Sequence, residues 1–395
     1  MKKRVPHIQV EFSTATNDIV AGIGHYTLGI TLGLDELAAE GKLTYSLIVP
    51  RHRSSRVTRF NLRNYKKIIT NPIPSRFMRG FMKYHWNVPM NWLLGRGRYY
   101  FPSFEAWPTW GAKSSVVFHD MTYLAEPDCV MKGHRNYMLR FMPFSTKNAH
   151  NIITVSEFSK TEITCYLHYP KSKIFVATPS IDRRLFYKRS ASEIYKVKLK
   201  YDIWFEDYIL SVGSIEPRKN YERLLDAYVS LPRKVTDKYP LVMVGADGWE
   251  NEALLAKIQR AKENGYKIIK PARFVEDKDL PALYSGTQFF VFVPIYEGFG
   301  MPPLEALACG TPVLASKGTS VTEAVGDAAV YCDPFSAKDI AEKLRYMVSE
   351  TEKDRSQWDD RINKHLESLN WRKSAEITAS ALTDLPVSYF KREAK

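Results

Sequence analysis

The sequence predicts an α/β protein with two doubly wound domains, each a parallel sheet covered by helices on both faces. A chain of 395 residues with 45% hydrophobic residues exceeds what one core usually supports and holds enough apolar material for two. Short apolar runs typical of buried strands alternate with helical patterns in both halves, which implies parallel sheets. No window approaches the 18 or so consecutive apolar residues of a membrane-spanning helix.

The first domain is predicted to cover residues 1–190. Its helical pattern lies at residues 26–40, and its strand patterns lie at residues 8–12, 43–50, 116–119 and 152–155. A mixed stretch at about 182–207 then separates the two halves.

The second domain is predicted to cover residues 200–374 and repeats the alternation more cleanly. Its strands are predicted at residues 208–212, 241–244, 267–269, 289–293 and 312–315, with helices at 221–231, 252–264, 277–285 and 303–309. A last helical pattern begins at Trp371. We expect the C-terminal helix, about 375–395, to pack back on the first domain, as is common in two-domain proteins of this type.

The formal net charge of +14 is concentrated in one window. Residues 51–100 carry twelve Lys or Arg, and no carboxylate lies between Glu40 and Glu105. Aromatic residues are interleaved with these cations, most clearly in the amphipathic-looking stretch 76–84. This combination suits an anionic membrane surface or a phosphate-bearing partner, and on charge alone nucleic acid fits equally well. The alternative is a solvated surface over core aromatics, because long cationic side chains often cover ordinary apolar surface.

The cysteines and the start of the chain indicate a reducing compartment. The basic residues 1–4 lead into a strand pattern without the apolar region of an export signal, so we expect a cytoplasmic protein. No CxxC spacing suggests a zinc or redox site, and we expect reduced structural residues at all four cysteines, Cys129, Cys165, Cys309 and Cys332.

The most specific motif runs from Phe289 to Val313 and reads FFVFVPIYEGFGMPPLEALACGTPV. A buried strand delivers a glycine-flanked loop. Pro302 and Pro303 suit the first turn of the following helix, where a missing N–H costs nothing. The loop therefore exposes backbone N–H groups beside the positive end of a helix dipole, which predicts an anion site at the carboxyl edge of a parallel sheet.

Two carboxylates, Glu297 and Glu305, flank this predicted anion site. A carboxylate beside a phosphate is repelled by it unless the carboxylate accepts hydrogen bonds from hydroxyl groups of the ligand. Sugar and ribose hydroxyls are good donors of such bonds. The pair therefore points to a nucleotide sugar rather than a bare nucleotide. The alternative makes Glu305 a charge that complements the helix dipole and Glu297 a turn residue. Agreement of glycines, prolines and carboxylates in one string favours the site.

A second cluster, Gly213 to Asn220, directly follows a strand and reads GSIEPRKN. Arg218 and Lys219 at a helix entrance can neutralise a diphosphate, with the forked guanidinium holding two oxygens and the ammonium acting as a point charge. Taken alone, this string is more typical of a solvated basic turn.

Two weaker signals lie in the first half. Gly22 and Gly24 precede a helix and leave room for a ligand to approach the backbone, although loop glycines without a ligand are the ordinary case. His119 and Asp120 end a strand at the sheet edge, where a histidine can hydrogen-bond a substrate hydroxyl. A satisfied structural histidine explains that string almost as well.

Together these strings resemble the retaining glycosyltransferases of family 4, also called group 1, which have the GT-B fold of two facing Rossmann-like domains with a cleft between them. The matching strings are spread over nearly the whole chain: residues 22–24, 119–120, 155–159, 213–220 and 297–305. The last of these strings is the family's specific signature. The resemblance implies hexose transfer from a nucleotide sugar to a glycan, with retention at the anomeric carbon, in bacterial surface-polysaccharide or O-antigen assembly.

The resemblance also implies roles for individual residues. Arg218 and Lys219 would bind the donor diphosphate, Glu297 the sugar hydroxyls and Glu305 the ribose. His119 would contact the sugar near the reaction centre. The other donor-binding residues implied in this way are Gly22, Gly24, Gly213, Phe274, Val275, Gly298, Phe299, Gly300 and Met301. Ser214 departs from the pattern, because many relatives have an arginine at this position.

The implied partners are a nucleotide sugar and a glycan acceptor, which we expect to be lipid-linked and met at the inner face of the membrane. By overall similarity we favour GDP-mannose, with a UDP-hexose or a dTDP- or GDP-deoxyhexose as alternatives. Cations and a helix terminus can stabilise the leaving diphosphate, and no DxD-type pair is suitably placed, so we expect no metal and no other cofactor.

Two alternatives remain open. A sugar-nucleotide epimerase or a phosphorylase would share the fold. A basic nucleic-acid-binding protein would use the window 51–100, but it leaves the string from Glu297 to Glu305 unexplained, and we expect no nucleic-acid partner.

Overall fold

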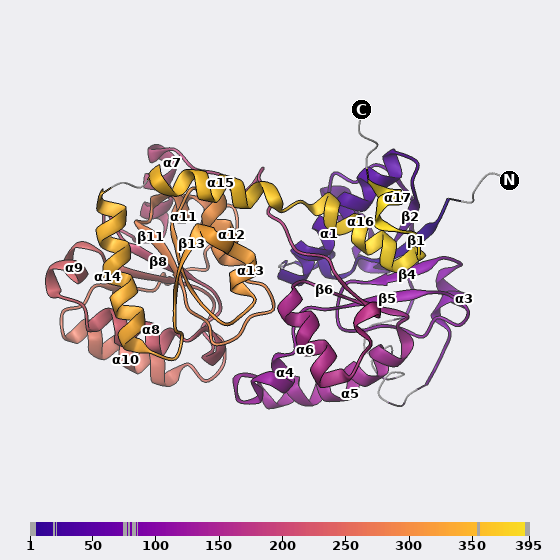
Figure 1. Ribbon diagram of the computed structural model, residues 1–395, viewed down its shortest axis with the longest axis horizontal. Coiled ribbons are helices and arrows are strands. Elements are labelled where there is room, and N and C mark those ends of the chain that lie inside the picture. Colours follow the sequence, from indigo (N-terminus) through magenta and orange to yellow (C-terminus); the bar gives the residue numbers. More distant parts are fainter. Residues whose placement is uncertain are drawn as a thin grey trace. The chain divides into compact units, whose positions relative to one another are not determined.

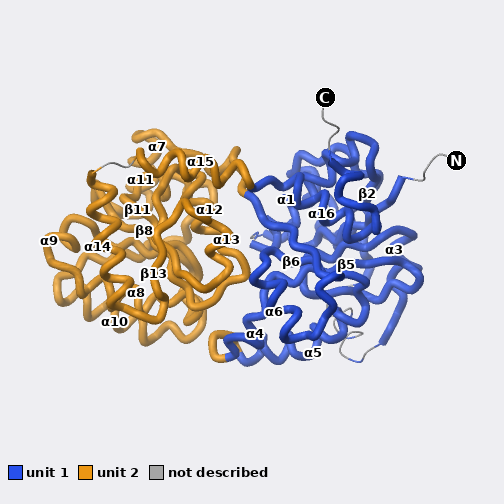
Figure 2. Tube along the Cα trace, viewed as in Figure 1, with its two compact units in different colours: residues 1–127, 132–180, 369–395 blue, residues 128–131, 181–368 orange. Residues whose placement is uncertain are grey.

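The computed structural model describes residues 5–18, 20, 22–73, 77, 80, 84, 86–353 and 356–391. The chain divides into two compact units, with unit 1 formed by residues 1–127, 132–180 and 369–395 and unit 2 by residues 128–131 and 181–368 (Figure 2). Each unit is built on one parallel sheet, which confirms the predicted fold class.

Within the described residues, unit 1 has a seven-stranded sheet in the order β3-β2-β1-β4-β5-β6-β7. The central strands are buried, apolar and fully parallel, as expected for a sheet covered on both faces. The strands are β1 (His7–Glu11), β2 (Thr44–Pro50), β3 (Tyr65–Asn71), β4 (Arg98–Phe101), β5 (Ser114–Phe118), β6 (Asn151–Thr154) and β7 (Ile174–Val176).

Helices cover both faces of this sheet. In Figure 1, α1 and α16 lie on one side of it and α4, α5 and α6 on the other. The α-helices in the described part of unit 1 are α1 (Gly22–Ala39), α3 (Met90–Leu94), α4 (Thr122–Ala125), α5 (Lys132–Asn148), α6 (Glu157–Leu167), α16 (Trp371–Thr383) and α17 (Val387–Phe390).

In the described part of unit 2, a six-stranded parallel sheet has the order β10-β9-β8-β11-β12-β13. Its strands are β8 (Ile209–Val212), β9 (Leu241–Val244), β10 (Ile268–Ile269), β11 (Phe289–Phe292), β12 (Val313–Ser316) and β13 (Ala329–Cys332). Its helices are α7 (Ala191–Lys200), α8 (Tyr221–Val229), α9 (Arg233–Lys238), α10 (Glu252–Glu263), α11 (Leu280–Gly286), α12 (Met301–Ala308), α13 (Val321–Val325), α14 (Ala337–Lys353) and α15 (Asp359–Ser368).

Both sheets reverse their strand order at one point. In unit 2 the chain runs from β8 outward through β9 and β10, then returns to β11 on the other side of β8. In unit 1 the same reversal separates β1 from β4. Open α/β sheets bind ligands beyond the carboxyl ends of the strands at such switch points. The loops that follow β8 and β11, and those that follow β1 and β4, are therefore the places to look for chemistry.

The C-terminal helix α16 belongs to unit 1, where it packs along α1. Gly29 and Gly33 of α1 face it, because an added Cβ at Gly29 would overlap the Trp371 ring and one at Gly33 would lie 2.6 Å from Cβ of Ala375. Arg372 fastens α16 further by a bidentate ion pair with Glu40, at 2.8 and 2.7 Å.

The close packing of α1 against α16 predicts that one added methyl group at position 29 lowers the stability of the protein. Gly29→Ala should destabilise the protein by about 1–3 kcal/mol, because overpacking outweighs the better helix propensity of alanine. Gly22→Ala in the same helix is the matched control, since nothing lies within 4 Å of its added Cβ. Thermal unfolding of the two variants should show a lowered midpoint for Gly29→Ala only. Equal midpoints would contradict the packing.

The structure corrects two local predictions. Helix α1 begins at Gly22, so Gly22 and Gly24 lie in its first turn and not in a preceding loop. A larger residue does not fit at position 24, because an added Cβ would lie 2.7 Å from the carbonyl oxygen of Thr14. The stretch around 182–207, read as mixed, contains α7, which begins with a capping box between Ser190 and Glu193, and it belongs to unit 2.

Part of the basic window forms the edge of the first sheet. Strand β3 is an edge strand, and its Lys66 and Lys67 are exposed, a usual way of keeping an edge from pairing with another chain. Most of the stretch 76–84 lies outside the described residues. Among the described helices, none combines the length and the apolar composition needed to cross a bilayer.

Candidate active site

Two loops meet at the switch point of unit 2, one after β8 and one after β11. Asn220 joins them: it adopts a left-handed conformation (φ 61°), and its Nδ2 donates hydrogen bonds to the carbonyl oxygens of Val293 (2.9 Å) and Pro334 (2.7 Å). The backbone N–H of Ile295 also donates to the carbonyl of Arg218 at 2.9 Å. The two loops therefore form one connected structure.

Glycine makes room for the first of these loops. An added Cβ at Gly245, after β9, would overlap the carbonyl oxygen of Gly213, and Gly213 itself has a φ of +155°. The turn continues into a short 3₁₀ helix, η5 (Pro217–Lys219), which carries the two cations at its end.

A largely buried ion cluster, whose side chains are 10–19% exposed, occupies the junction of the loops. The carboxylate of Glu297 contacts Nζ of Lys219 and lies 2.7 Å from Nη1 of Arg218. The Arg218 guanidinium also pairs with Glu216 through Nη2 at 2.7 Å and donates to the carbonyl of Tyr296 at 3.1 Å. Lys219 lies over the Phe292 ring, 5.0 Å from its centroid. The cluster thus combines two cations with two carboxylates.

The cluster keeps Glu297 ionised. Burial alone would raise its pKa, but the nearby Arg218 and Lys219 outweigh burial and lower the pKa below the ordinary value. Burial lowers the pKa of Lys219, and the ion pair with Glu297 opposes that shift. A buried charge of either sign is tolerated here because it has partners.

Helix α12 begins beside the cluster. Its N-cap is Gly300, with φ +103° and no side-chain cap, and prolines occupy its first turn. The loop before it is held by Ser320, whose hydroxyl donates to the carbonyl of Glu297 at 2.6 Å. Because Pro302 and Pro303 have no N–H, the backbone N–H of Met301 and the positive end of the helix dipole make this terminus favourable for an anion.

Glu305 lies within α12 and is not in its first turn, so it does not serve as the N-terminal charge of the helix. Its carboxylate accepts a hydrogen bond from the hydroxyl of Tyr284 at 2.9 Å. Tyr284 is buried in α11, and burial holds its pKa well above the ordinary value. The bond fixes the direction of the Glu305 side chain.

The structure therefore groups only some of the residues singled out in the sequence. Arg218, Lys219 and Glu297 are in direct contact, and the remaining residues of the two loops adjoin them: Gly213, Gly298, Phe299, Gly300 and Met301. Phe274 and Val275 follow the edge strand β10, which β9 separates from β8. Phe274 is 62% exposed and Val275 is buried.

His119 follows β5 in unit 1 and is half-buried. Its Nε2 lies 2.8 Å from the carbonyl oxygen of Pro102; because a carbonyl only accepts, Nε2 carries the proton and Nδ1 is left as an acceptor. The ring packs edge-on against Tyr26 (5.1 Å) and Phe104 (5.7 Å). Burial lowers the pKa of His119, so the imidazole is neutral at pH 7.

Sequence reasoning missed Glu11, a buried acid at the switch point of unit 1. It ends β1 and accepts a hydrogen bond from the backbone N–H of Ser13 at 3.1 Å. Burial raises its pKa to about 7. The signal was available, because Glu11 is the one carboxylate in the apolar run from Ile8 to Phe12.

The raised pKa of Glu11 predicts a pH-dependent stability. Between pH 4.5 and about 7 the unfolded chain releases a proton that the folded chain keeps, so this carboxyl makes folding less favourable as pH rises. Glu11→Gln should therefore stabilise the protein at pH 8 by up to about 3 kcal/mol, with no gain at pH 4.5. Thermal unfolding at both pH values tests this, and an equal effect at both would contradict it.

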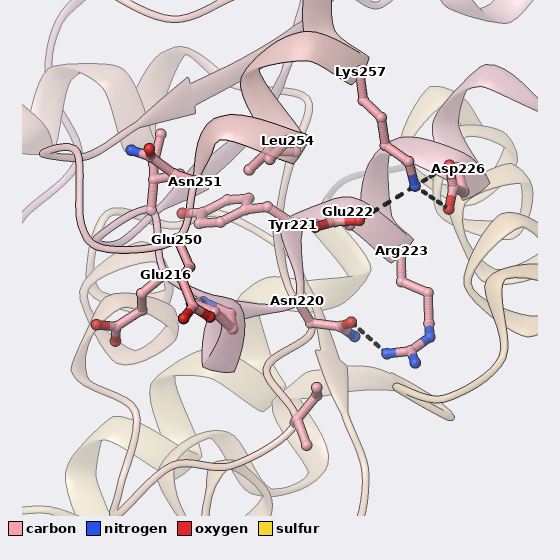
Figure 3. A pocket seen from close by; sticks show the side chains of 13 residues that line it. Glu216, Asn220, Tyr221, Glu222, Arg223, Asp226, Glu250, Asn251, Leu254 and Lys257 are labelled. Carbon is pink, nitrogen blue, oxygen red and sulfur yellow. Dashed lines mark hydrogen bonds and ion pairs between the residues drawn. The ribbon is translucent and has the colours of Figure 1, made fainter. Parts of the chain in front are cut away.

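A pocket of about 280 Å³ adjoins the ion cluster, between α8 and the first turns of α10, and Glu216, Asn220 and Ile295 of the two loops form part of its lining (Figure 3). Its charged lining residues are Glu216, Glu222, Arg223, Asp226, Glu250 and Lys257. Lys257 is already paired with Asp226 at 3.0 Å, and Arg223 donates to Asn220 at 2.7 Å. Because carboxylates outnumber cations here, the pocket does not suit a diphosphate.

Comparison with known proteins identifies the second unit. Residues 205–365 match the family model described as glycosyl transferases group 1. The O-antigen chain mannosyltransferase B of Escherichia coli is 38% identical over 222 residues, which are 56% of this chain and 58% of that protein. The serotype-specific mannosyltransferase WbdA of Escherichia coli is 27% identical over 288 residues, 71% of this chain and 33% of that protein. The chain thus spans less than two thirds of either relative.

A solved structure matches the fold along nearly the whole chain. WaaG, a glycosyltransferase involved in lipopolysaccharide biosynthesis, aligns with a TM-score of 0.65 and 15% identity, covering 95% of this chain and 99% of WaaG. Residues 205–365 therefore form a group 1 glycosyltransferase domain, in a chain whose two parallel-sheet units have the GT-B fold.

Proposed function

We propose that the chain is a retaining hexosyltransferase that moves mannose from GDP-mannose to a glycan acceptor in O-antigen or related surface-polysaccharide assembly. The observation that carries the proposal is the ion cluster of Lys219, Arg218 and Glu297 beside the N-terminus of α12, at the switch point of a group 1 glycosyltransferase domain. The choice of mannose rests on the names of the two Escherichia coli relatives.

In this proposal the main chemical task is to stabilise the leaving nucleoside diphosphate. The bond between the anomeric carbon and the diphosphate oxygen breaks, and the acceptor hydroxyl forms the new bond on the same face. The hydroxyl proton passes to the departing phosphate oxygen. Lys219, the backbone N–H of Met301 and the positive end of the α12 dipole hold the charge that develops on the diphosphate. Because such groups are already oriented, they lower the barrier without reorganising during the reaction.

Glu297 has two successive partners in this account. Without donor it is the counter-ion of Lys219 and Arg218. A diphosphate brings negative charge to the same cations, which frees the carboxylate to accept hydroxyl groups of the donor sugar. The contact with the sugar and the contact with the cations therefore compete.

Arg218 differs from Lys219 because it has a second carboxylate, Glu216, at 2.7 Å. Its guanidinium also donates to the carbonyl of Tyr296 in the second loop. We therefore assign to Arg218 mainly the positioning of Glu297, and to Lys219 the direct contact with the diphosphate. The assignments of Glu305 to the ribose, of His119 to the sugar, and of the loop glycines to the donor stay predictions, as do those of Phe274 and Val275.

The proposal includes activity without a divalent metal and a lipid-linked acceptor at the inner face of the membrane. The cations of the cluster supply the charge that a metal supplies in other transferases. Transfer that persists after exhaustive treatment with EDTA would support the first point.

The direct test is to incubate the purified chain with GDP-mannose, a panel of other nucleotide sugars and a mannose-containing acceptor. We expect a product one hexose heavier that retains the anomeric configuration of the donor. Conversion of the nucleotide sugar without acceptor would indicate an epimerase. A requirement for inorganic phosphate would indicate a phosphorylase. Either outcome would replace the proposal.

A further inference from the structure

Unit 1 carries an exposed cluster of large apolar side chains at and beside α3, which we call the tryptophan patch: Trp92, Leu93 and Trp110. Their exposed fractions are 75%, 51% and 56%. Trp86 and Val88, in the segment just before α3, are exposed as well. Scattered exposed apolar residues are ordinary, but neighbouring ones mark a surface that meets an apolar partner.

The fold holds these side chains outward. Met90 and Leu94 anchor α3 in the core of unit 1, beside Tyr99, Phe101 and Trp107, and this leaves Trp92 and Leu93 on the outer side of a helix at the margin of the unit (Figure 2).

Hydrogen bonds tie α3 to the segment that carries Trp110. The N–H of Met90 donates to the carbonyl of Pro108 at 2.9 Å, and Nδ2 of Asn91 donates to the carbonyl of Trp110 at 2.8 Å. The two tryptophan rings meet edge to face, with centroids 5.7 Å apart. The patch is therefore a built feature of the fold.

Positive charges predominate near the patch, although Lys113, three residues after Trp110, is paired with Asp384. The patch lies at the end of the window 51–100, with its twelve Lys or Arg, and no carboxylate occurs between Glu40 and Glu105. Arg96, two residues after α3, is exposed, as are Lys66 and Lys67 on the edge strand β3. Tryptophan rings favour the level of lipid headgroups, and basic side chains are attracted to anionic lipids.

We propose that the tryptophan patch inserts into the interface of an anionic lipid bilayer and holds unit 1 on the membrane. Tryptophan can also stack on sugar rings, but sugar sites need acceptors for the hydroxyl groups. This surface offers aliphatic Leu93 and Val88, and Glu105, the carboxylate nearest in sequence to Trp110, already accepts a hydrogen bond from Tyr137. The surface would bring the chain to a lipid-linked acceptor. The role of that acceptor rests on the proposed function, whereas binding of the patch to the bilayer does not.

Vesicle sedimentation of the full chain tests this. The wild-type chain should sediment with vesicles of phosphatidylcholine and phosphatidylglycerol, and less as salt is raised, but weakly with phosphatidylcholine alone. The double variant Trp92→Ala, Trp110→Ala should bind the anionic vesicles about tenfold more weakly or worse at every salt concentration. Trp204→Ala is the matched control, because Trp204 is equally exposed (69%) but lies in unit 2.

Two readouts make the outcome decisive. Stabilisation of the double variant by GDP should equal that of wild type, which separates loss of the membrane contact from failure of the proposed donor site. Equal sedimentation of the double variant and wild type would overturn the proposal. The proposal would also be overturned if the wild-type chain did not bind vesicles but bound lipid-free polysaccharide, and if this binding were lost in the double variant. That result would make the patch a glycan-binding surface.

Discussion

Lys219→Ala is expected to reduce kcat for hexose transfer by about a hundredfold or more, because a preorganised charge aimed at the leaving group contributes on that scale. The Lys219 side chain is 10% exposed, and its ammonium group contacts Glu297, three residues before the N-cap of α12. Its loss removes the cation that we assign to the diphosphate and leaves Arg218 to compensate Glu297. Steady-state kinetics with saturating donor measure the effect.

Two further variants separate charge from folding in this prediction. Lys219→Arg keeps a positive charge and should recover part of the lost rate. Lys238→Ala removes an exposed lysine of the same unit, one paired with Glu352 at 2.7 Å, and should transfer at the wild-type rate. If Lys219→Ala transferred hexose at a near-normal rate with a normal melting temperature, Lys219 would lose its role.

Glu297→Gln should have opposite effects on turnover and on diphosphate affinity. Turnover should fall about a hundredfold, because the amide is a weaker acceptor for the sugar hydroxyls and removes the charge that orients them. GDP should bind more tightly, by about tenfold, because the carboxylate that competes for Lys219 and Arg218 is gone.

Calorimetry and thermal unfolding measure the two sides of this prediction. Without ligand the variant should unfold at a lower temperature than wild type, because two buried cations have lost their shared counter-ion. GDP should raise its melting temperature by more than it raises that of wild type. Glu263→Gln, an exposed acid at the end of α10, is the control. Weaker GDP binding by Glu297→Gln would contradict the proposal that the diphosphate replaces Glu297 as the partner of Lys219 and Arg218.

The sequence predicted the second sheet closely because its central strands are short, continuous apolar runs between glycine or proline signals. The predicted strands 241–244 and 289–293 became β9 and β11, Leu241–Val244 and Phe289–Phe292. Strands β3, β4 and β7 of the first sheet and β13 of the second were missed. Arg98–Phe101 mixes a cation with aromatics, and Ile174–Val176 has only three residues, so neither shows a period.

Helix α7 was also missed, although the capping box between Ser190 and Glu193 was legible in the sequence. The polar composition of the segment concealed it. The start of α1 was placed too late because glycine is usual in loops. In the fold, Gly24 sits in a helix and is small because Thr14 lies against it.

For the candidate site, the sequence located the two loops but not the contacts between them. Strand ends of a parallel sheet meet at one edge, so Arg218, Lys219 and Glu297 were expected near one another. That Arg218 would hold both Glu216 and Glu297 depends on the path of the η5 turn, which Asn220 fixes by bonding to Val293 and Pro334. Such tertiary bonds leave no periodic signal.

The most direct test of the account is a crystal structure of the chain with GDP bound. We predict that the diphosphate lies at the switch point of unit 2, with oxygens in contact with Nζ of Lys219 and the backbone N–H of Met301, and with Glu297 turned away from the lysine. A nucleotide bound instead in the acidic pocket between α8 and α10, with the pair of Lys219 and Glu297 unchanged, would contradict it.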